Sequence, residues 1–335
     1  MRVDGGLTAE LDQVDGNIRE LEEMGYDGAL CAETSHDPFL PLTLAARESE
    51  RIELMTSIAV AFARSPMTLA SVGHDLNQYS KGRFIMGLGS QIKPHITKRF
   101  SMPWYSPAKQ MKELISAMRA IWSCWHEGTK LDFRGEYYQH TLMTPMFTPT
   151  NTGYGAPRVF LAAVGPLMTQ VAGEVADGVI IHAFTTEKYL RETTLPNIDK
   201  GLAAGGRKRE DFQIAYPCFV VTGTDEESFA RAKETVTRQI GFYGSTPAYR
   251  PVLESIGAGE LQPVLNTLSK EGKWAGMGEL ISDDLLREFA VVGEPKDVAP
   301  EMLRRYGDVV DRCSSAYGTV PRSEQKAIID ALKAG

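Results

Sequence analysis

The sequence predicts an α/β protein built as a (β/α)8 barrel with insertions. Strand-like and helix-like segments alternate from one end of the 335 residues to the other. Eight segments have β character, and most are short apolar runs, as is typical of parallel strands covered on both faces. The chain length also fits one barrel, since barrels of roughly 250 to 400 residues are common.

The eight predicted strands are distributed over the whole chain. They are Arg2–Gly6, Gly28–Glu33, Ile52–Val60, Arg83–Gly89, Arg158–Val164, Gly178–Ala183, Gln213–Val221 and Val309–Tyr317. Strands joined by right-handed helical crossovers favour a closed barrel. A doubly wound open sheet is the alternative, although the GxGxxG turn that usually follows its first strand is missing.

Eight helices are predicted between these strands. They are Thr8–Met24, Pro38–Ser49, Pro66–Tyr79, Pro107–His126, Leu167–Val175, Glu187–Ala204, Asp225–Ile240 and Pro295–Tyr306. Gly25 follows the first helix and suits the left-handed residue that ends many helices. Residues 128–157, with a hairpin-like run, and residues 242–286 exceed a minimal barrel. We interpret them as insertions in a single domain spanning residues 1–335, placed near the active site or at subunit contacts.

Composition and charge exclude several classes of protein. The net charge is −7 and no basic run stands out, which argues against nucleic acid as a partner. No run of 18 apolar residues predicts a membrane span, and the first residues do not resemble an apolar signal region. The four cysteines are far apart and lack CxxC spacing, as expected for reduced thiols in a cytoplasmic protein.

The carboxyl ends of barrel strands are where catalytic residues are expected. Glu33 ends the second predicted strand and His36 comes shortly after it, His95 follows the fourth and His182 lies at the end of the sixth. Such groups can act as a general acid or contact a ligand near neutral pH, although a structural role is the alternative for each histidine. The chain has no HxH or HExxH spacing and no GxSxG turn, so we predict no metal site and no serine hydrolase.

Two predicted strand-to-helix turns suit an anionic ligand. In the tight βαβ unit of residues 159–182, Val164 and Gly165 end a strand and open a helix, and Gly165 leaves room for a phosphate. Thr185, Thr186 and Lys188 open the helix after the sixth strand, with hydroxyls and a cation near its N-terminus. An ordinary βα turn and a helix cap with a solvated lysine are the alternatives.

Three motifs in sequence order resemble the bacterial luciferase-like superfamily, and within it the branch that uses the deazaflavin coenzyme F420. They are RSPMTLA (residues 64–70), SKGRFIMGLGS (80–90) and AVGP with AGEVADG (163–166 and 172–178). The resemblance runs from Val3 to about Tyr317. It implies a barrel, often a homodimer, that transfers a hydride between C5 of the deazaflavin and a small organic substrate.

The resemblance also implies site residues. Relatives carry a non-prolyl cis peptide on the third strand, matched here by Ser57–Ile58, and an acidic residue beside the cofactor, matched by Glu33. We expect Glu33 or His36 to be the proton donor. Contacts with the cofactor's ring, tail or phosphate are implied for Ser57, Ile58, Ser90, Gln91, His95, Val164, Gly165, Thr185, Thr186 and Lys188.

Some positions depart from the glucose-6-phosphate dehydrogenases of this family. Those enzymes have a histidine where this chain has Thr34 and a glutamate where it has Ile92, so sugar-phosphate oxidation is not expected. A hydrophobic alcohol, ketone, imine or enone is the expected substrate. The aromatic-rich candidates for its pocket, for which core or dimer packing is the alternative, are Met102, Pro103, Trp104, Phe133, Tyr137, Tyr138 and Phe147.

Two other functions remain open at this point. An FMN-dependent monooxygenase that uses dioxygen and a reductase partner is the nearest alternative, because FMN also presents a tricyclic ring and a phosphate. A non-catalytic protein that only binds the cofactor is the second. In each case the expected partner is a small molecule rather than a nucleic acid or a membrane.

Overall fold

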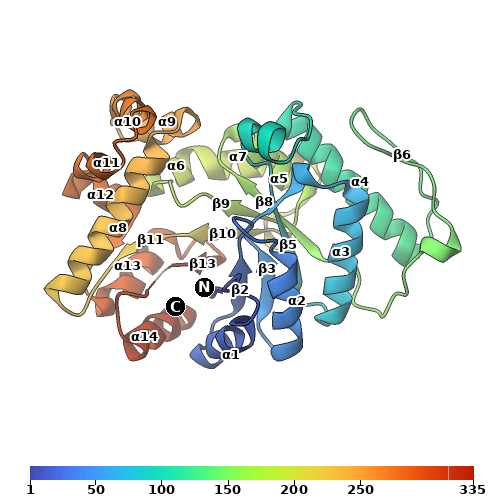
Figure 1. The fold of residues 1–335 in the computed structure, drawn as a ribbon, viewed down its shortest axis with the longest axis horizontal. Coiled ribbons are helices and arrows are strands. Elements are labelled where there is room, and N and C mark those ends of the chain that lie inside the picture. Colours follow the sequence, from blue (N-terminus) through green and yellow to red (C-terminus); the bar gives the residue numbers. More distant parts are fainter. Residues whose placement is uncertain (316) are drawn as a thin grey trace.

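The computed structural model describes residues 1–315 and 317–335, apart from the side chain of Ala275. Eight parallel strands close into a barrel with helices around it (Figure 1), as predicted. They are β1 Arg2–Gly6, β2 Gly28–Cys31, β3 Glu53–Thr56, β5 Phe84–Gly89, β8 Arg158–Ala163, β9 Gly178–Ile181, β10 Gln213–Pro217 and β13 Arg312–Ser314. Pairing of β1 with both β2 and β13, and of β3 with β5, closes the barrel.

Helices cover the outside of the barrel, as the alternating pattern predicted. They are α1 Val14–Met24, α2 Phe39–Glu48, α3 Pro66–Tyr79, α4 Pro107–Glu127, α5 Pro166–Val175, α6 Glu187–Tyr189, α7 Leu195–Ala204, α8 Glu226–Gly244, α13 Pro295–Tyr306 and α14 Arg322–Ala334. Gly25 ends α1 with φ of 87°, which confirms the predicted left-handed cap. Among the described residues, no helix combines the length and the apolar character needed to cross a bilayer.

Several predicted boundaries were wrong. The first helix begins at Val14 rather than Thr8, and the predicted helix 187–204 is α6 and α7 joined by a widened turn, Leu190–Thr194. The predicted strand 52–60 is β3 followed by the short β4 (Ala59–Val60), which pairs with β5. The last predicted strand ends at Ser314, and Ala316 within it lies outside the described residues.

The seventh predicted strand, 213–221, is also two strands. After β10, the chain leaves the barrel and β11 (Phe219–Val221) pairs in parallel with β12 (Ala290–Val292), which the sequence did not reveal. The intervening insertion is helical, as expected. Its helices lie around the end of α8 (Figure 1) and are α9 Arg250–Ser255, α10 Leu261–Lys270, α11 Ala275–Glu279 and α12 Asp283–Phe289.

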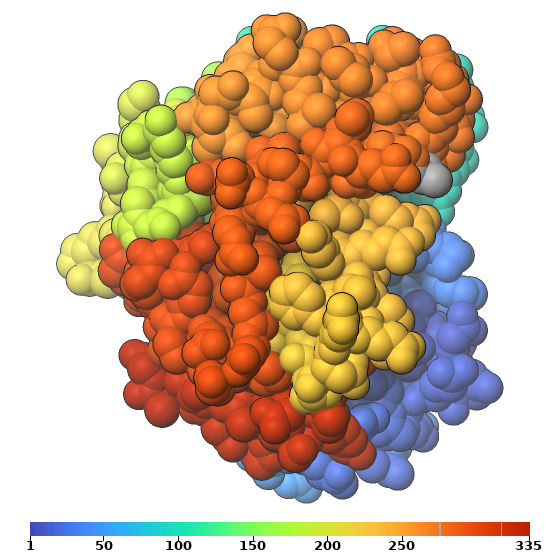
Figure 2. All heavy atoms as spheres, turned by 90° about the vertical axis from the view of Figure 1, so that its left-hand side faces the viewer, coloured from blue at the N-terminus to red at the C-terminus, as the bar shows by residue number. Residues whose placement is uncertain are grey.

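The other insertion, residues 128–157, carries a small antiparallel hairpin of β6 (Phe133–Arg134) and β7 (Gln139–His140). It extends from α4 at the edge of the molecule opposite α8 (Figure 1). In contrast, the segment after α8 forms a continuous surface above the beginning of that helix, orange over yellow in Figure 2. The two insertions therefore lie on opposite sides of the barrel.

The buried apolar side chains form separate clusters in the barrel and in the second insertion. One large core lies between the barrel and its helices, and a smaller cluster that includes Met55, Ile85 and Phe160 fills the barrel interior, as in other closed barrels. A separate cluster joins α8 to the second insertion and to β11 and β12, with Phe184, Val236 and Phe289 among its buried members. This insertion is thus held by its own apolar core next to the barrel mouth.

Candidate active site

A cavity of about 470 Å³, here called the mouth cavity, lies at the carboxyl ends of the barrel strands. Gly6, Leu30, Pro217 and Ser314 contribute to it from β1, β2, β10 and β13. Its side wall is a face of α8 with Ala232, Thr235, Val236, Gln239 and Tyr243. Active sites of (β/α)8 enzymes lie at this end of the barrel, so we take the mouth cavity as the candidate active site.

Asp4 is the single charged residue among the described residues that line the mouth cavity. It is 1% exposed, and Arg312 donates to its carboxylate from Nε at 2.8 Å and from Nη2 at 2.7 Å. A narrow space of about 10 Å³ shares Asp4 and Leu30 with the cavity and is also lined by Ser57. The cavity therefore extends toward the β3–β4 turn, and its one carboxylate is already neutralised by a buried partner.

Glu33 lies just beyond β2 and is bound on two sides. Its Oε2 accepts from Nη1 of Arg64 at 2.6 Å and from the backbone N–H of Val60 at 2.8 Å. Burial lowers the pKa of Arg64, but its hydrogen bonds to Glu33 and Asp37 raise that pKa above the ordinary value. Arg64 therefore stays charged, and the two hydrogen bonds of Glu33 hold Arg64 and Val60 in position.

His36 lies on the same loop, and about half of its side chain is exposed. Its Nε2 is 3.4 Å from a carboxylate oxygen of Glu10. The loop is tied down on both sides of this histidine, because Arg64 donates to Asp37 at 2.7 Å and Arg99 donates to the carbonyl of Thr34 at 2.6 Å. The structure thus brings both predicted proton donors to one rim of the barrel, with His36 the more accessible of the two.

The peptide bond between Ser57 and Ile58 is cis, at the position that the resemblance indicated. It separates β3 from β4 and lies against two glycines of β5. A Cβ added to Gly87 would lie 1.8 Å from the carbonyl oxygen of Thr56, and one added to Gly89 would lie 2.8 Å from Cδ1 of Ile58. The GLG part of the second motif is therefore explained by close packing, since a larger residue would displace this turn.

Ser90, Gln91 and His95 follow β5, which is four strands from β13 in either direction around the barrel. Gln91 has φ of 57°, and its side chain accepts from the N–H of Ile92 at 2.9 Å. Ser90 donates to the carbonyl of Gln91 at 3.2 Å, and His95 is exposed. These residues therefore lie on the opposite side of the barrel from β13, which contributes Ser314 to the mouth cavity.

Val164 and Gly165 form the turn into α5. Gly165 is the residue before the helix, no side chain caps this end, and a Cβ on Gly165 would meet nothing within 4 Å. The first N–H groups of a helix attract anions, especially where no side chain competes for them. This turn therefore fits the predicted phosphate contact.

Thr185, Thr186 and Lys188 are not gathered into one open cluster. The hydroxyl of Thr186 accepts from the N–H of Tyr189 at 3.1 Å and so caps α6, while Lys188 is exposed. Thr185 is 2% exposed, and among the described atoms its Oγ1 has no hydrogen-bond partner. Of the three side chains, Thr185 is the one with a buried polar atom that makes no hydrogen bond among the described atoms.

His182 lies at the end of β9, where the sequence predicted its position but no particular role. Its Nδ1 accepts from the N–H of Phe184 at 3.0 Å, which leaves the ring hydrogen on Nε2. Its ring lies 4.5 Å from that of Tyr243 and 4.7 Å from that of Tyr249, measured between centroids. Burial lowers the pKa of His182 to about 4 and raises that of Tyr249 to about 12, so these groups are uncharged at neutral pH.

Comparison with known proteins identifies the family. The model of the luciferase-like monooxygenases matches residues 2–312. The chain belongs to this family. A Mycobacterium tuberculosis protein of uncharacterised function is 52% identical over 312 residues, which are 93% of this chain and 92% of that protein. The 5,10-methylenetetrahydromethanopterin reductase of Archaeoglobus fulgidus is 27% identical over 289 residues, covering 84% and 82% of the two chains.

A solved structure gives the same fold. The coenzyme F420 dependent tetrahydromethanopterin reductase from Methanopyrus kandleri superposes with a TM-score of 0.78 at 20% identity, covering 98% of this chain and 96% of that one. At this level of identity the likeness establishes the fold alone. The luciferase-like family thus accounts for the barrel predicted from the strand pattern.

The seven residues predicted for the substrate pocket do not line the mouth cavity of this luciferase-like barrel. Phe133, Tyr137 and Tyr138 belong to the first insertion, where the hydroxyl of Tyr138 accepts from Gln110 of α4 at 2.9 Å. Phe147 is 73% exposed on the same segment, and Trp104 packs against Phe62 at 5.9 Å between ring centroids. The sequence predicted an aromatic pocket from these residues, but the aromatic side chains that line the mouth cavity are Phe219 on β11 and Tyr243 on α8.

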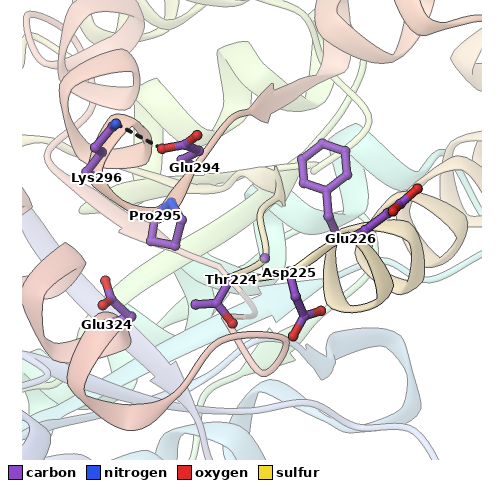
Figure 3. A pocket seen from close by; sticks show the side chains of 9 residues that line it. Thr224, Asp225, Glu226, Glu294, Pro295, Lys296 and Glu324 are labelled. Atoms are coloured by element: carbon purple, nitrogen blue, oxygen red, sulfur yellow. Dashed lines mark ion pairs between the residues drawn. The ribbon is translucent and has the colours of Figure 1, made fainter.

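A larger cavity, of about 640 Å³, lies where α8 and α13 begin. Its lining includes Asp225, Glu226, Glu294 and Glu324, and Lys296, the one cation among its described lining residues, pairs with Glu294 at 2.9 Å (Figure 3). Carboxylates repel the phosphate of a flavin-like cofactor, and no predicted site residue lines this space. Size alone therefore does not locate the active site in this protein.

Proposed function

We propose that the protein is a coenzyme F420-dependent oxidoreductase that moves a hydride between C5 of the deazaflavin and a small, mainly apolar substrate. An alcohol or ketone, an imine or an enone would suit the site. The observation that carries the proposal is the mouth cavity, which offers a mostly apolar wall and no free charge beside the Ser57–Ile58 turn. Similarity to a methylenetetrahydromethanopterin reductase over most of the chain supports the same class of reaction.

Two features of the chain fit such a cofactor. The uncapped N-terminus of α5 at Gly165 suits its phosphate, and the turn packed on Gly87 and Gly89 suits the back of its ring. When bound, the coenzyme supplies the carbon that gives or accepts the hydride. The protein's part is to fix the ring against the substrate and to keep water out of the cavity.

The residues of the β2 loop would handle the proton. We assign the donor role to His36, because its ring is open to a ligand while Glu33 is bound by Arg64 and Val60. A His36→Ala variant should lose about 10²-fold in kcat, the lower range for general acid catalysis. Full turnover with an unchanged pH profile would remove His36 from this role, and Glu33→Gln would then be the next variant to test.

The decisive experiment for the cofactor is a pair of binding titrations, with coenzyme F420 and with FMN. We expect micromolar or tighter binding of F420 and much weaker binding of FMN. The reverse result would favour the FMN-dependent monooxygenase, with dioxygen as co-substrate and a reductase as partner. Tight F420 binding without turnover of any alcohol, ketone, imine or enone would favour a cofactor-binding protein.

We also expect the protein to be a homodimer, and a measurement of its mass in solution tests this.

A further inference from the structure

A row of aromatic rings leads from the barrel mouth to the surface of the second insertion. It starts at His182 on β9, 4.5 Å from the ring of Tyr243 between centroids. Tyr243 is 5.4 Å from Phe242, which is 5.9 Å from Trp274 near the start of α11. About half of the surface of Phe242 and of Trp274 is exposed. The row therefore ends in two aromatic faces that are open to a ligand.

These two faces line a second cavity of about 480 Å³, here called the outer cavity. It lies between α8 and α11, and its described lining residues are Thr235, Arg238, Gln239, Phe242, Tyr243, Trp274 and Met277. Met277 is 1% exposed and is the most deeply buried of these lining residues. Arg238 is the one charged residue in this lining, and its nearest carboxylate, on Glu234, is 3.9 Å away and largely exposed.

The mouth cavity and the outer cavity share a wall. Thr235, Gln239 and Tyr243 line both of them. These residues are spaced four apart on α8, so they form one stripe along the helix. The mouth cavity lies on one side of the stripe and the outer cavity on the other. A molecule that crosses the stripe would reach from the strand ends to Trp274 along the row of rings.

We propose that the two cavities together bind one elongated substrate, and that Trp274 determines specificity for its distal end. The reacting carbonyl, alcohol, imine or enone group lies in the mouth cavity, and a planar aromatic group lies in the outer cavity against Phe242 and Trp274. A single negative charge on the aromatic end pairs with Arg238. The part of this inference that concerns the reacting group rests on the proposed function, whereas the aromatic subsite does not.

The chemistry of each cavity supports this division. Aromatic side chains bind planar rings through stacked or edge-to-face contacts, and a weakly paired guanidinium prefers an anion. Among the described residues that line the mouth cavity, none carries a free charge, so a charged group is better placed at the outer end. A compact substrate would fill the mouth cavity alone and leave the aromatic faces of Phe242 and Trp274 in water.

The subsite can be tested without any turnover, using the full-length protein and 8-anilino-1-naphthalenesulfonate, a planar aromatic probe with one sulfonate. We expect one saturable site with energy transfer from tryptophan, because the half-exposed Trp274 lines the outer cavity itself. Trp274→Ala should raise the probe's Kd about tenfold. Arg238→Gln should raise it several-fold and weaken its dependence on salt. Met146→Ala, at a residue that is 88% exposed on the other insertion, is the control and should leave Kd unchanged.

Turnover with reduced F420 tests the elongated substrate itself. Cyclohexanone and a naphthyl-substituted ketone that carries a carboxylate are compared in the wild type and in Trp274→Ala. The variant should raise KM for the long ketone about tenfold and leave KM for cyclohexanone unchanged. Equal probe affinity in wild type and Trp274→Ala overturns the aromatic subsite. A Trp274-dependent probe site in a protein that does not bind F420 supports the subsite and refutes the proposed function, so the two failures are distinguishable.

Discussion

The rim formed after β2 and β3 is charged, whereas the rim formed after β9 and β10 is aromatic. On the first, Arg64 binds both Glu33 and Asp37. On the second, the uncharged His182 lies between Tyr243 and Tyr249. Ion pairs fix the position of a loop because their geometry is specific, while aromatic walls admit apolar molecules of varied shape. Under the proposed function, the charged rim would position the cofactor and His36, and the aromatic rim would select the substrate.

The largest expected effect is on the charged rim. Arg64→Met would leave the carboxylate of Glu33, whose side chain is 6% exposed, without its cation. We expect a loss of about 3 kcal/mol in the free energy of unfolding, because an unpaired buried charge is costly. Urea unfolding followed by circular dichroism measures this loss, and cofactor affinity should fall in the same variant.

Two further variants sharpen this prediction. Arg99→Met removes a hydrogen bond to the carbonyl of Thr34 and a cation–π contact with Phe100, both from an exposed side chain, and should cost about 1.5 kcal/mol or less. Adding Glu33→Gln to Arg64→Met removes the buried charge and should restore part of the stability. If Arg64→Met were no less stable than Arg99→Met, the charged rim would not depend on this ion pair.

The aromatic rim should show its effect as a dependence of stability on pH. The pKa of His182 is lowered from 6.5 to about 4 by burial, so the unfolded chain binds a proton here at a higher pH than the folded one. The stability from this group is therefore complete above pH 6.5 and is lost as the pH falls toward 4. Over this pH range, the contribution of His182 to the free energy of unfolding should fall by about 3 kcal/mol.

His182→Asn tests this assignment, because asparagine keeps an acceptor near Nδ1 and removes the titration. The difference in unfolding free energy between wild type and variant should shrink by about 3 kcal/mol from pH 7 to pH 4. Other titrating groups cancel in this difference, which isolates His182. A difference that stays constant over the same range would mean that the imidazole is solvated and not enclosed by the two tyrosines.

The elements that sequence predicted best are those whose ends carry local markers. β1, α3 and α13 have the predicted bounds, since turn residues or an initial proline delimit each of them. The run 213–221 has a continuous apolar pattern, which by itself predicts a single strand. It divides because Phe219–Val221 pairs with Ala290–Val292, a partner about 70 residues away that no local pattern reveals.

The candidate site also depends on contacts between residues that are far apart in the sequence. Barrel topology alone placed Glu33, His36 and Gly165 at strand ends, because parallel strands bring those ends to one face. The pairing of Glu33 with Arg64 depends on two segments about 30 residues apart. Tyr243 lies in the last turn of α8, beyond the predicted end of that helix at Ile240. Its contact with His182 joins residues about 60 apart in the sequence, so the aromatic rim could not be predicted from a local pattern.

The smallest expected effect is that of Gly165→Ala, which should weaken cofactor binding without lowering stability. Gly165 has φ of −93° and open space where a Cβ would lie, so Gly165→Ala should unfold at the wild-type midpoint or slightly above it. If the cofactor phosphate approaches the first amides of α5, the added methyl group should weaken F420 binding about tenfold, or about 1.4 kcal/mol. Gly16→Ala, which also has open space but lies on α1, is the matched control. Unchanged F420 affinity in Gly165→Ala would place the phosphate elsewhere, and Thr185, with its unused hydroxyl, would then be the residue to substitute next.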